Sequence, residues 1–202
     1  MYAPNKEPDT IRVPSVLAPV KNFSDFLNRQ MELLHSRNNH HADFVLRSSD
    51  GHKFPVHRFQ LAAHSPVFAA MLSHDVREKR TSRCDLIDVD KETVEILLDY
   101  LYAFNTARIN GTNAEKALAM ADKYEIMDLC SICEGILIKS LAVENVVRRF
   151  IMAHQRGLKI LKEVALRLMR QNIDVIGEDS VLQTAIQSEP ALLQIIMGCF
   201  PK

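Results

Sequence analysis

The pattern of apolar and polar positions divides the chain into a short strand-rich stretch and a long helical one. Apolar residues alternate with polar ones over 44–46 and again over 54–56, on either side of Asp50-Gly51. This arrangement is typical of a β-hairpin closed by a tight turn. A third short strand is predicted over 84–89. Between them, Ser65-Pro66 predicts a helix start, with serine as N-cap and proline at the first helical position.

Helical spacing dominates the rest of the chain. Apolar positions that recur every three or four residues predict helices over 94–101, 117–124, 126–137, 146–151, 158–170, 181–187 and 191–197. Another such stretch runs from Phe23 to Ser36, after a proline-punctuated lead-in over 1–20. An isolated helix of that length is marginal in water, so its apolar face needs a partner. The predicted fold class is α+β: a small three-stranded sheet flanked by helical hairpins and followed by C-terminal helical pairs.

Composition narrows the function classes. The chain has 202 residues, with 25 basic and 25 acidic side chains that cancel. No overall basic field therefore favours nucleic acid or an anionic membrane surface as a partner. We find neither a secretory-signal pattern nor about 18 consecutive apolar residues, the length of a membrane span. We therefore expect no membrane partner and a location in the nucleus, the cytoplasm or both.

The candidate catalytic and metal-binding residues do not form a constellation. Cys130 and Cys133 make a single CxxC inside a helical pattern, where core packing is the favoured interpretation. Asp43 and His57 could act as a carboxylate–imidazole pair in catalysis. Such a pair needs a nucleophile and an oxyanion site beside it, and the sequence shows neither. The histidines at 35, 40, 41, 52 and 64 are not spaced with cysteines in the way that a tetrahedral metal site requires. The sequence thus predicts no enzyme activity, no cofactor and no metal site.

Several motifs in a fixed order resemble the BTB/POZ domain family. They are Asp43-Phe-Val-Leu46, Phe54-Pro-Val-His57, Leu61-Ala-Ala-His-Ser-Pro-Val-Phe68-Ala-Ala-Met71, Ile87-Asp-Val89, Ala119-Met-Ala-Asp-Lys-Tyr124 and Cys133-Glu134. The resemblance implies the BTB/POZ fold. One departure is clear: the family's "Y-T-G" is replaced by Tyr102-Ala103-Phe104, so a differently shaped loop is expected there.

Flanking motifs resemble the MATH–BTB branch of the family, to which the speckle-type POZ protein belongs. They are Val13-Pro14 with Leu17-Ala18 before the domain, and Ser140-Leu-Ala-Val-Glu-Asn145 after it. The resemblance covers about residues 13–175. No MATH domain precedes residue 13, which leaves open a fragment of a longer protein or a shortened relative. The implied organisation is a lead-in over 1–20, a BTB/POZ domain with a dimerisation helix over 21–139, and a three-box/BACK-like extension over 140–202.

The resemblance also implies a function. BTB proteins of this kind serve as substrate adaptors or scaffolds of cullin-3 RING ubiquitin ligases, acting as dimers that bind the N-terminal region of the cullin. The alternative is a BTB homo- or hetero-oligomerisation module that does not engage a cullin. The substrate protein, the choice between homodimer and heterodimer, and the choice between nucleus and cytoplasm stay open.

The residues implied for these contacts fall into two groups. Val76 and Glu78 fit the family's hydrophobic–any–glutamate motif for cullin-3, in the loop after the helix begun by Ser65-Pro66. Val146 and Phe150 fit the three-box helix, although packing in the core between paired helices is the favoured interpretation of most of their apolar area. Dimerisation is implied for the apolar face of the first helix, formed by Phe23, Phe26, Leu27, Met31 and Leu34. An isologous dimer would bury that face.

Overall fold

A three-stranded sheet begins the part of the chain that the structure describes. The structure is a computed structural model and describes residues 42–73, 80–172 and 187. Strands β1 (Phe44–Ser48) and β2 (Lys53–Val56) pair antiparallel, and β3 (Arg83–Leu86) pairs parallel to β1, giving the order β2-β1-β3. The predicted hairpin is confirmed. The third strand ends at Leu86, earlier than predicted, because a turn bonds the Val89 amide to the Leu86 carbonyl.

Two short helices follow the hairpin. Helix α2 (Arg58–His64) and helix α3 (Pro66–Ser73) are separated by Ser65, which acts as the predicted N-cap of α3. The Ser65 hydroxyl accepts the Phe68 amide proton at 3.0 Å and donates to the Tyr124 carbonyl at 2.6 Å. The Phe68 and Tyr124 rings stack with centroids 4.4 Å apart. One serine therefore starts α3 and also ties it to a distant segment.

Three longer helices complete the main core. They are α5 (Lys91–Ala103), α6 (Ala114–Lys123) and α7 (Met127–Lys139). Asp90 caps α5 by accepting the Thr93 amide proton at 2.9 Å, and its carboxylate also meets the Lys116 ammonium at 2.7 Å. These interactions, Lys116 foremost, lower the pKa of Asp90 to about 2. The largest completely buried core side chains include Phe44, Phe68, Leu46, Leu61, Leu97, Leu101, Leu118, Leu129 and Leu137.

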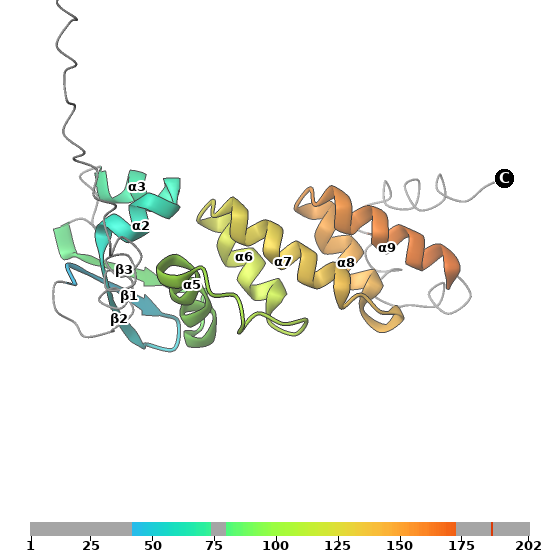
Figure 1. The fold of residues 1–202 in the computed structure, drawn as a ribbon, viewed down its shortest axis with the longest axis horizontal. Coiled ribbons are helices and arrows are strands. Elements are labelled where there is room, and N and C mark those ends of the chain that lie inside the picture. Colours follow the sequence, from blue (N-terminus) through green and yellow to red (C-terminus); the bar gives the residue numbers. More distant parts are fainter. Residues whose placement is uncertain (1–41, 74–79, 173–186, 188–202) are drawn as a thin grey trace, which may run out of the picture. The chain divides into compact units, whose positions relative to one another are not determined.

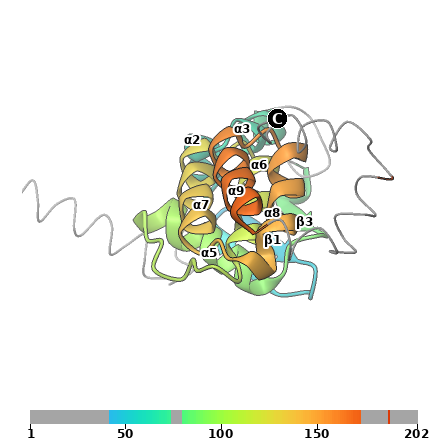
Figure 2. The same cartoon turned by 90° about the vertical axis from the view of Figure 1, so that its right-hand side faces the viewer.

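A further helical pair follows α7. Helices α8 (Val143–Gln155) and α9 (Lys159–Gln171) pack on each other, and α9 also contacts α7 (Figures 1 and 2). Their facing sides form a second apolar cluster made of Val146, Val147, Phe150, Ala165, Leu166 and Met169. The C-terminal pairing predicted from helical spacing is therefore present up to residue 171. The predicted helices over 23–36 and 191–197 lie outside the described residues.

The guanidinium of Arg149 joins the first part of this fold to the second. Arg149 on α8 is only 3% exposed. It donates to the Leu137 carbonyl at 2.9 Å, the Ser140 hydroxyl at 3.1 Å and the Gly111 carbonyl at 2.9 Å. A Cβ at Gly111 would lie 2.7 Å from the Ser140 Cβ, so this close approach requires glycine. The α5–α6 loop, the end of α7 and α8 thus share one buried cation.

Replacing Arg149 with methionine should lower the free energy of unfolding by about 3 kcal/mol, because two carbonyls and a hydroxyl would lose their donor. Arg148→Met is the matched control. Arg148 is 68% exposed and bonds Glu115, the carboxylate that also lies 3.4 Å from the Arg149 guanidinium, so its loss should cost about 0.5 kcal/mol. Urea denaturation measures both values. Equal costs for the two variants would contradict the role assigned to the Arg149 network.

Candidate interaction surface

Most of the contact residues implied by the sequence lie outside the described part of the chain. Val76 and Glu78 belong to the segment between Ser73, the last residue of α3, and Arg80. The five apolar residues assigned to the dimerisation helix, between Phe23 and Leu34, also lie outside it. Both assignments stay predictions.

Val146 and Phe150 are described, and both side chains are completely buried. They lie in the cluster between α8 and α9, against residues such as Ala165 and Met169. In this conformation neither side chain is accessible to a partner. The position therefore favours the core alternative, and an influence of these two residues on a partner would act through the placement of α8 and α9.

Asp43 and His57 do not form a pair. The Asp43 carboxylate accepts the amide proton of Arg58 at 2.8 Å, at the start of α2. The His57 amide donates to the Tyr102 hydroxyl at 2.9 Å, and the His57 ring nitrogen Nδ1 lies 3.0 Å from the same oxygen. The BTB/POZ resemblance implies buried polar structure at both positions, and this is wrong for Asp43, which is exposed because it accepts the first amide of α2 at the surface, while His57 is half-buried.

The CxxC cysteines lie in the core on α7. Burial is the first cause that raises the pKa of Cys130 to about 11 and that of Cys133 to about 12. Within residues 42–73 and 80–172, no group of three histidine, cysteine or acidic side chains is placed to hold a metal ion. None of the described helices combines the length and the apolar character that a membrane crossing requires.

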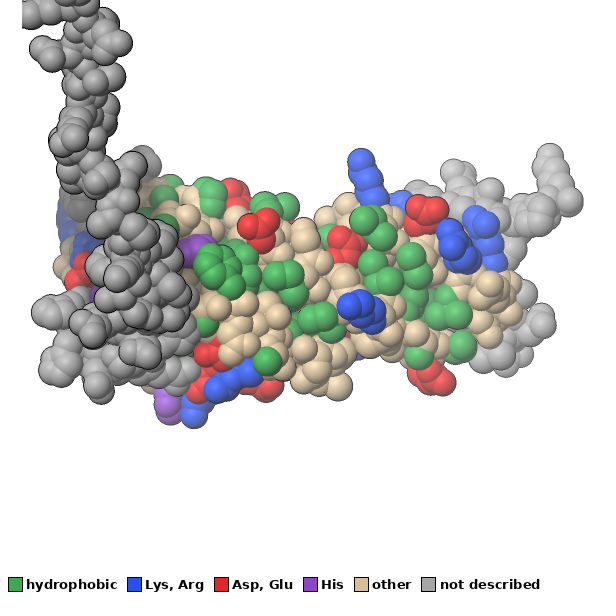
Figure 3. Space-filling view, in the orientation of Figure 1, with side chains coloured by type: hydrophobic (Ala, Val, Ile, Leu, Met, Phe, Trp, Pro, Cys, Tyr) green, Lys and Arg blue, Asp and Glu red, His purple; other side chains and the backbone are tan. Residues whose placement is uncertain are grey.

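An aromatic cluster that the sequence reasoning did not assign lies at the ends of α2 and α5. The Phe104 ring meets the His64 ring edge-on at 5.5 Å and the Tyr100 ring at 5.6 Å. Phe104 is 62% exposed and Met127, at the start of α7, is 65% exposed. Figure 3 shows hydrophobic side chains gathered on this face near the ends of these helices. The sequence feature that could have pointed to this cluster is Phe104, which stands where the family motif has a glycine.

Phe104 has an unusual backbone for its type. It ends α5 in the left-handed region with φ of 50°, where its amide bonds the Tyr100 carbonyl at 2.8 Å. A glycine adopts this conformation without a steric penalty, whereas a residue with a Cβ costs roughly 1–2 kcal/mol. The ring is thus held at the surface by a turn that glycine would fit better.

Beside this cluster lies a depression of about 340 Å³, here called the Tyr100 depression. Its lining residues are Ala62, Ala63, His64, Ser65, Pro66, Tyr100, Glu125, Ile126, Met127 and Asp128. Burial, and after it the nearby Asp128 carboxylate, raises the pKa of Tyr100, so its phenol is protonated at neutral pH. The depression therefore combines an aromatic wall, a phenol and two carboxylates.

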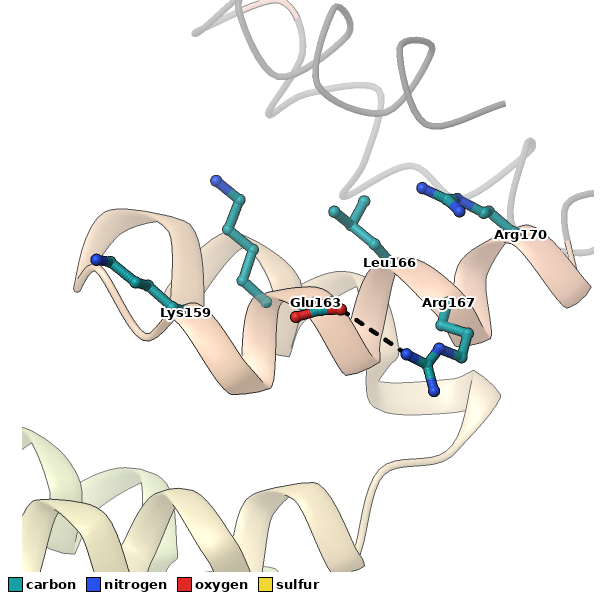
Figure 4. A pocket seen from close by; sticks show the side chains of 6 residues that line it. Lys159, Glu163, Leu166, Arg167 and Arg170 are labelled. Carbon is teal, nitrogen blue, oxygen red and sulfur yellow. Dashed lines mark ion pairs between the residues drawn. The ribbon is translucent and has the colours of Figure 1, made fainter. Parts of the chain in front are cut away.

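A second surface feature is a basic stripe on α9. Lys159, Lys162, Arg167 and Arg170 line a shallow hollow along α9, at whose base lies the mostly buried Leu166 of the α8–α9 cluster (Figure 4). Glu163 lies 3.8 Å from Arg167, and both side chains are largely exposed. This spacing is typical of the solvated face of an amphipathic surface helix, so the stripe has a structural explanation.

Taken together, the small sheet, the helical hairpins and the exposed aromatic surface define a protein-interaction module. The profile of the BTB/POZ domain family matches residues 33–141. The chain belongs to the BTB/POZ domain family. BTB domains mediate homo- and heterodimerisation and other protein contacts. The family assignment made from the sequence motifs is confirmed, whereas the comparisons do not decide the MATH–BTB branch.

Two curated mouse proteins (Mus musculus) are similar to the chain. TD and POZ domain-containing protein 4 is 31% identical over 144 residues, which is 71% of this chain and 39% of that protein. TD and POZ domain-containing protein 5 is 30% identical over 144 residues, covering 71% and 42%. The chain therefore spans about two fifths of the length of these relatives.

Two solved structures are also similar. The BTB domain of zebrafish PATZ1 has a TM-score of 0.49 at 18% identity, covering 58% of this chain and 95% of that chain. The BTB domain of human Gigaxonin has a TM-score of 0.46 at 25% identity, covering 54% and 88%.

The raised pKa values predict inert thiols in the folded protein. At pH 8 a thiol with a pKa of about 11 carries roughly a hundredfold less thiolate than one at 9, and the thiolate is the species that reacts. Iodoacetamide should therefore alkylate Cys130 and Cys133 only slowly, as followed by mass spectrometry. The control variant Ser131→Cys places a thiol at an exposed position of the same helix and should react fast. Rapid alkylation of Cys130 and Cys133 in the folded chain would contradict the prediction.

Proposed function

We propose that the chain is a dimeric, non-catalytic adaptor or scaffold subunit of a cullin-3 RING ubiquitin ligase. The observation that carries this proposal is the helical pair α8–α9, held against the BTB/POZ domain by the buried Arg149 network. A module that only oligomerises has no need of this extension. A partner that spans the domain and the extension needs the two parts at a fixed angle.

The proposed cullin contact centres on Val76 and Glu78. They follow α3, whose eight residues rise about 12 Å from Pro66 to Ser73. An interface of ordinary size buries about 800 Å² on each partner. Such an area can include the loop that carries Val76 and Glu78 together with the whole of α3. The valine would fill an apolar pocket and the glutamate would meet a donor at its rim.

The proposed dimer uses the helix predicted over 23–36. Its apolar positions include Phe26 and Leu27. On the described domain, Phe59 of α2 is a large exposed apolar side chain, and Val67 and Met71 of α3 are only partly buried. Such surfaces are available to receive the apolar helix of a second copy. The substrate would be bound by a further domain or by a partner protein.

Charge reversal in the loop tests the cullin contact. Val76→Asp and Glu78→Lys should each weaken binding to the N-terminal region of cullin-3 at least tenfold, because each removes a contact that is central to the proposed interface. Binding is measured by calorimetry with the purified fragment. Ile87→Asp is the control, since it places the same charge at another exposed apolar position and should leave binding unchanged.

Two outcomes would contradict this proposal at different levels. If wild type binds and both loop variants bind equally well, the two residues are not in the site. If wild type dimerises without binding the cullin fragment, the oligomerisation-only alternative is correct.

Charges in the first helix test the dimer. The double variant Phe26→Asp, Leu27→Asp should shift the chain from dimer to monomer at micromolar concentration, because two carboxylates in an apolar interface would be desolvated without partners. Light scattering coupled to size exclusion measures the mass. The control Asn28→Asp adds a charge at a neighbouring position outside the predicted apolar set. A wild-type chain that is monomeric under these conditions would refute the dimer.

A further inference from the structure

Three polar groups in the Tyr100 depression have no partner within the described part of the chain. Tyr100 is only 4% exposed, yet no hydrogen bond of its hydroxyl to a described residue is present. No described side-chain oxygen or nitrogen that is sealed from solvent lacks a partner, so this hydroxyl must open onto the depression. Glu125 and Asp128 are exposed, and no described cation lies within 4 Å of either carboxylate.

These carboxylates differ from most others in the described residues, although Asp50, Glu92, Glu134 and Glu144 are likewise more than 4 Å from any described lysine or arginine. Asp85, Asp88, Asp90, Glu95, Glu115 and Asp122 each lie within 4 Å of an arginine or lysine. Asp128 also lies in the first turn of α7, where a negative charge favours the helix. That accounts for an acidic residue at this position. It does not account for a buried phenol and an exposed aromatic ring beside it.

We propose that the Tyr100 depression binds an arginine side chain of a partner protein segment. The guanidinium would donate to the Asp128 and Glu125 carboxylates and to the phenol oxygen of Tyr100. The exposed Phe104 ring provides an aromatic surface over which a planar cation stacks. Met127 provides an apolar contact for the residues on either side of the arginine.

Arginine fits this set of groups better than lysine. Its planar fork presents five donors that satisfy two carboxylates and one phenol together, whereas the lysine ammonium is a compact and strongly hydrated charge. The strained turn at Phe104 supports the same partner. A glycine there would close the turn more easily, but it would remove the aromatic surface.

A short peptide provides the direct test, and it does not involve a cullin. Acetyl-Leu-Arg-Leu-amide is titrated into the full chain while the methyl resonance of Met127 is followed by NMR, with Met127→Leu used to assign that signal. The matched peptide replaces arginine by citrulline, which is neutral and nearly isosteric. We expect saturable shifts with the arginine peptide and at least tenfold weaker binding of the citrulline peptide.

Two variants locate the site and one controls for charge. Asp128→Asn should reduce the preference for arginine over citrulline at least fivefold. Phe104→Gly should weaken the binding of the arginine peptide several-fold without lowering the melting temperature, because glycine suits the left-handed turn. Glu163→Gln removes a carboxylate that does not line the depression and should leave binding unchanged.

The proposal is overturned by any of three results. They are equal binding of the two peptides, an arginine preference that survives Asp128→Asn, and a change of oligomeric state caused by Phe104→Gly. The last result would mean that a second copy of the chain covers the depression. The first two leave the cullin proposal intact, because that proposal rests on Val76 and Glu78, and loss of cullin binding leaves this inference intact.

Discussion

The arrangement of this protein depends on the pairing of one buried cation. A guanidinium removed from water is costly unless each donor finds an acceptor. Arg149 meets that requirement with the Glu115 carboxylate of α6, 3.4 Å from its Nε, and with Gly111 in a loop, Leu137 in α7 and Ser140 after it. Because these acceptors are satisfied only in one geometry, the network selects a single placement of α8 on the preceding domain.

This constraint explains how two apolar clusters act as one structure. The cluster between α8 and α9 is small, and helices of about thirteen residues are marginal on their own. Contact between α7 and α9 adds buried apolar area between the two clusters, and the hydrogen bonds of Arg149 fix the orientation of α8. Hydrophobic burial alone would permit several angles between the two parts, whereas hydrogen bonds fix one. A partner that contacts both the domain and the α8–α9 pair therefore binds a surface that is already formed.

The sequence predicted the fold better than the surface. Alternation around Asp50-Gly51 and the capping residue Ser65 specified the hairpin and α3, because local backbone preferences decide both. The network of Arg149 could not be read from the sequence, since its acceptors are backbone carbonyls brought close only by tertiary packing. Helical spacing favoured a buried position for Val146 and Phe150, but it defines only an apolar face and does not identify α9 as the helix that covers it.

The aromatic surface shows where local and global preferences disagree. Phe104 occupies a conformation that favours glycine, and the described structure offers its ring little burial in return. In natural proteins the local backbone preference of a residue usually agrees with the conformation that the fold imposes on it. A residue that is strained without gaining burial is therefore a reason to look for a function. The rule that buried polar groups are satisfied leads to the same place. Arg149 obeys it within the chain, whereas the Tyr100 hydroxyl has no described hydrogen-bond partner and obeys it only because it is open to solvent at the depression. Its acceptor capacity is thus available to a group that comes from outside the chain, as in the proposed arginine site.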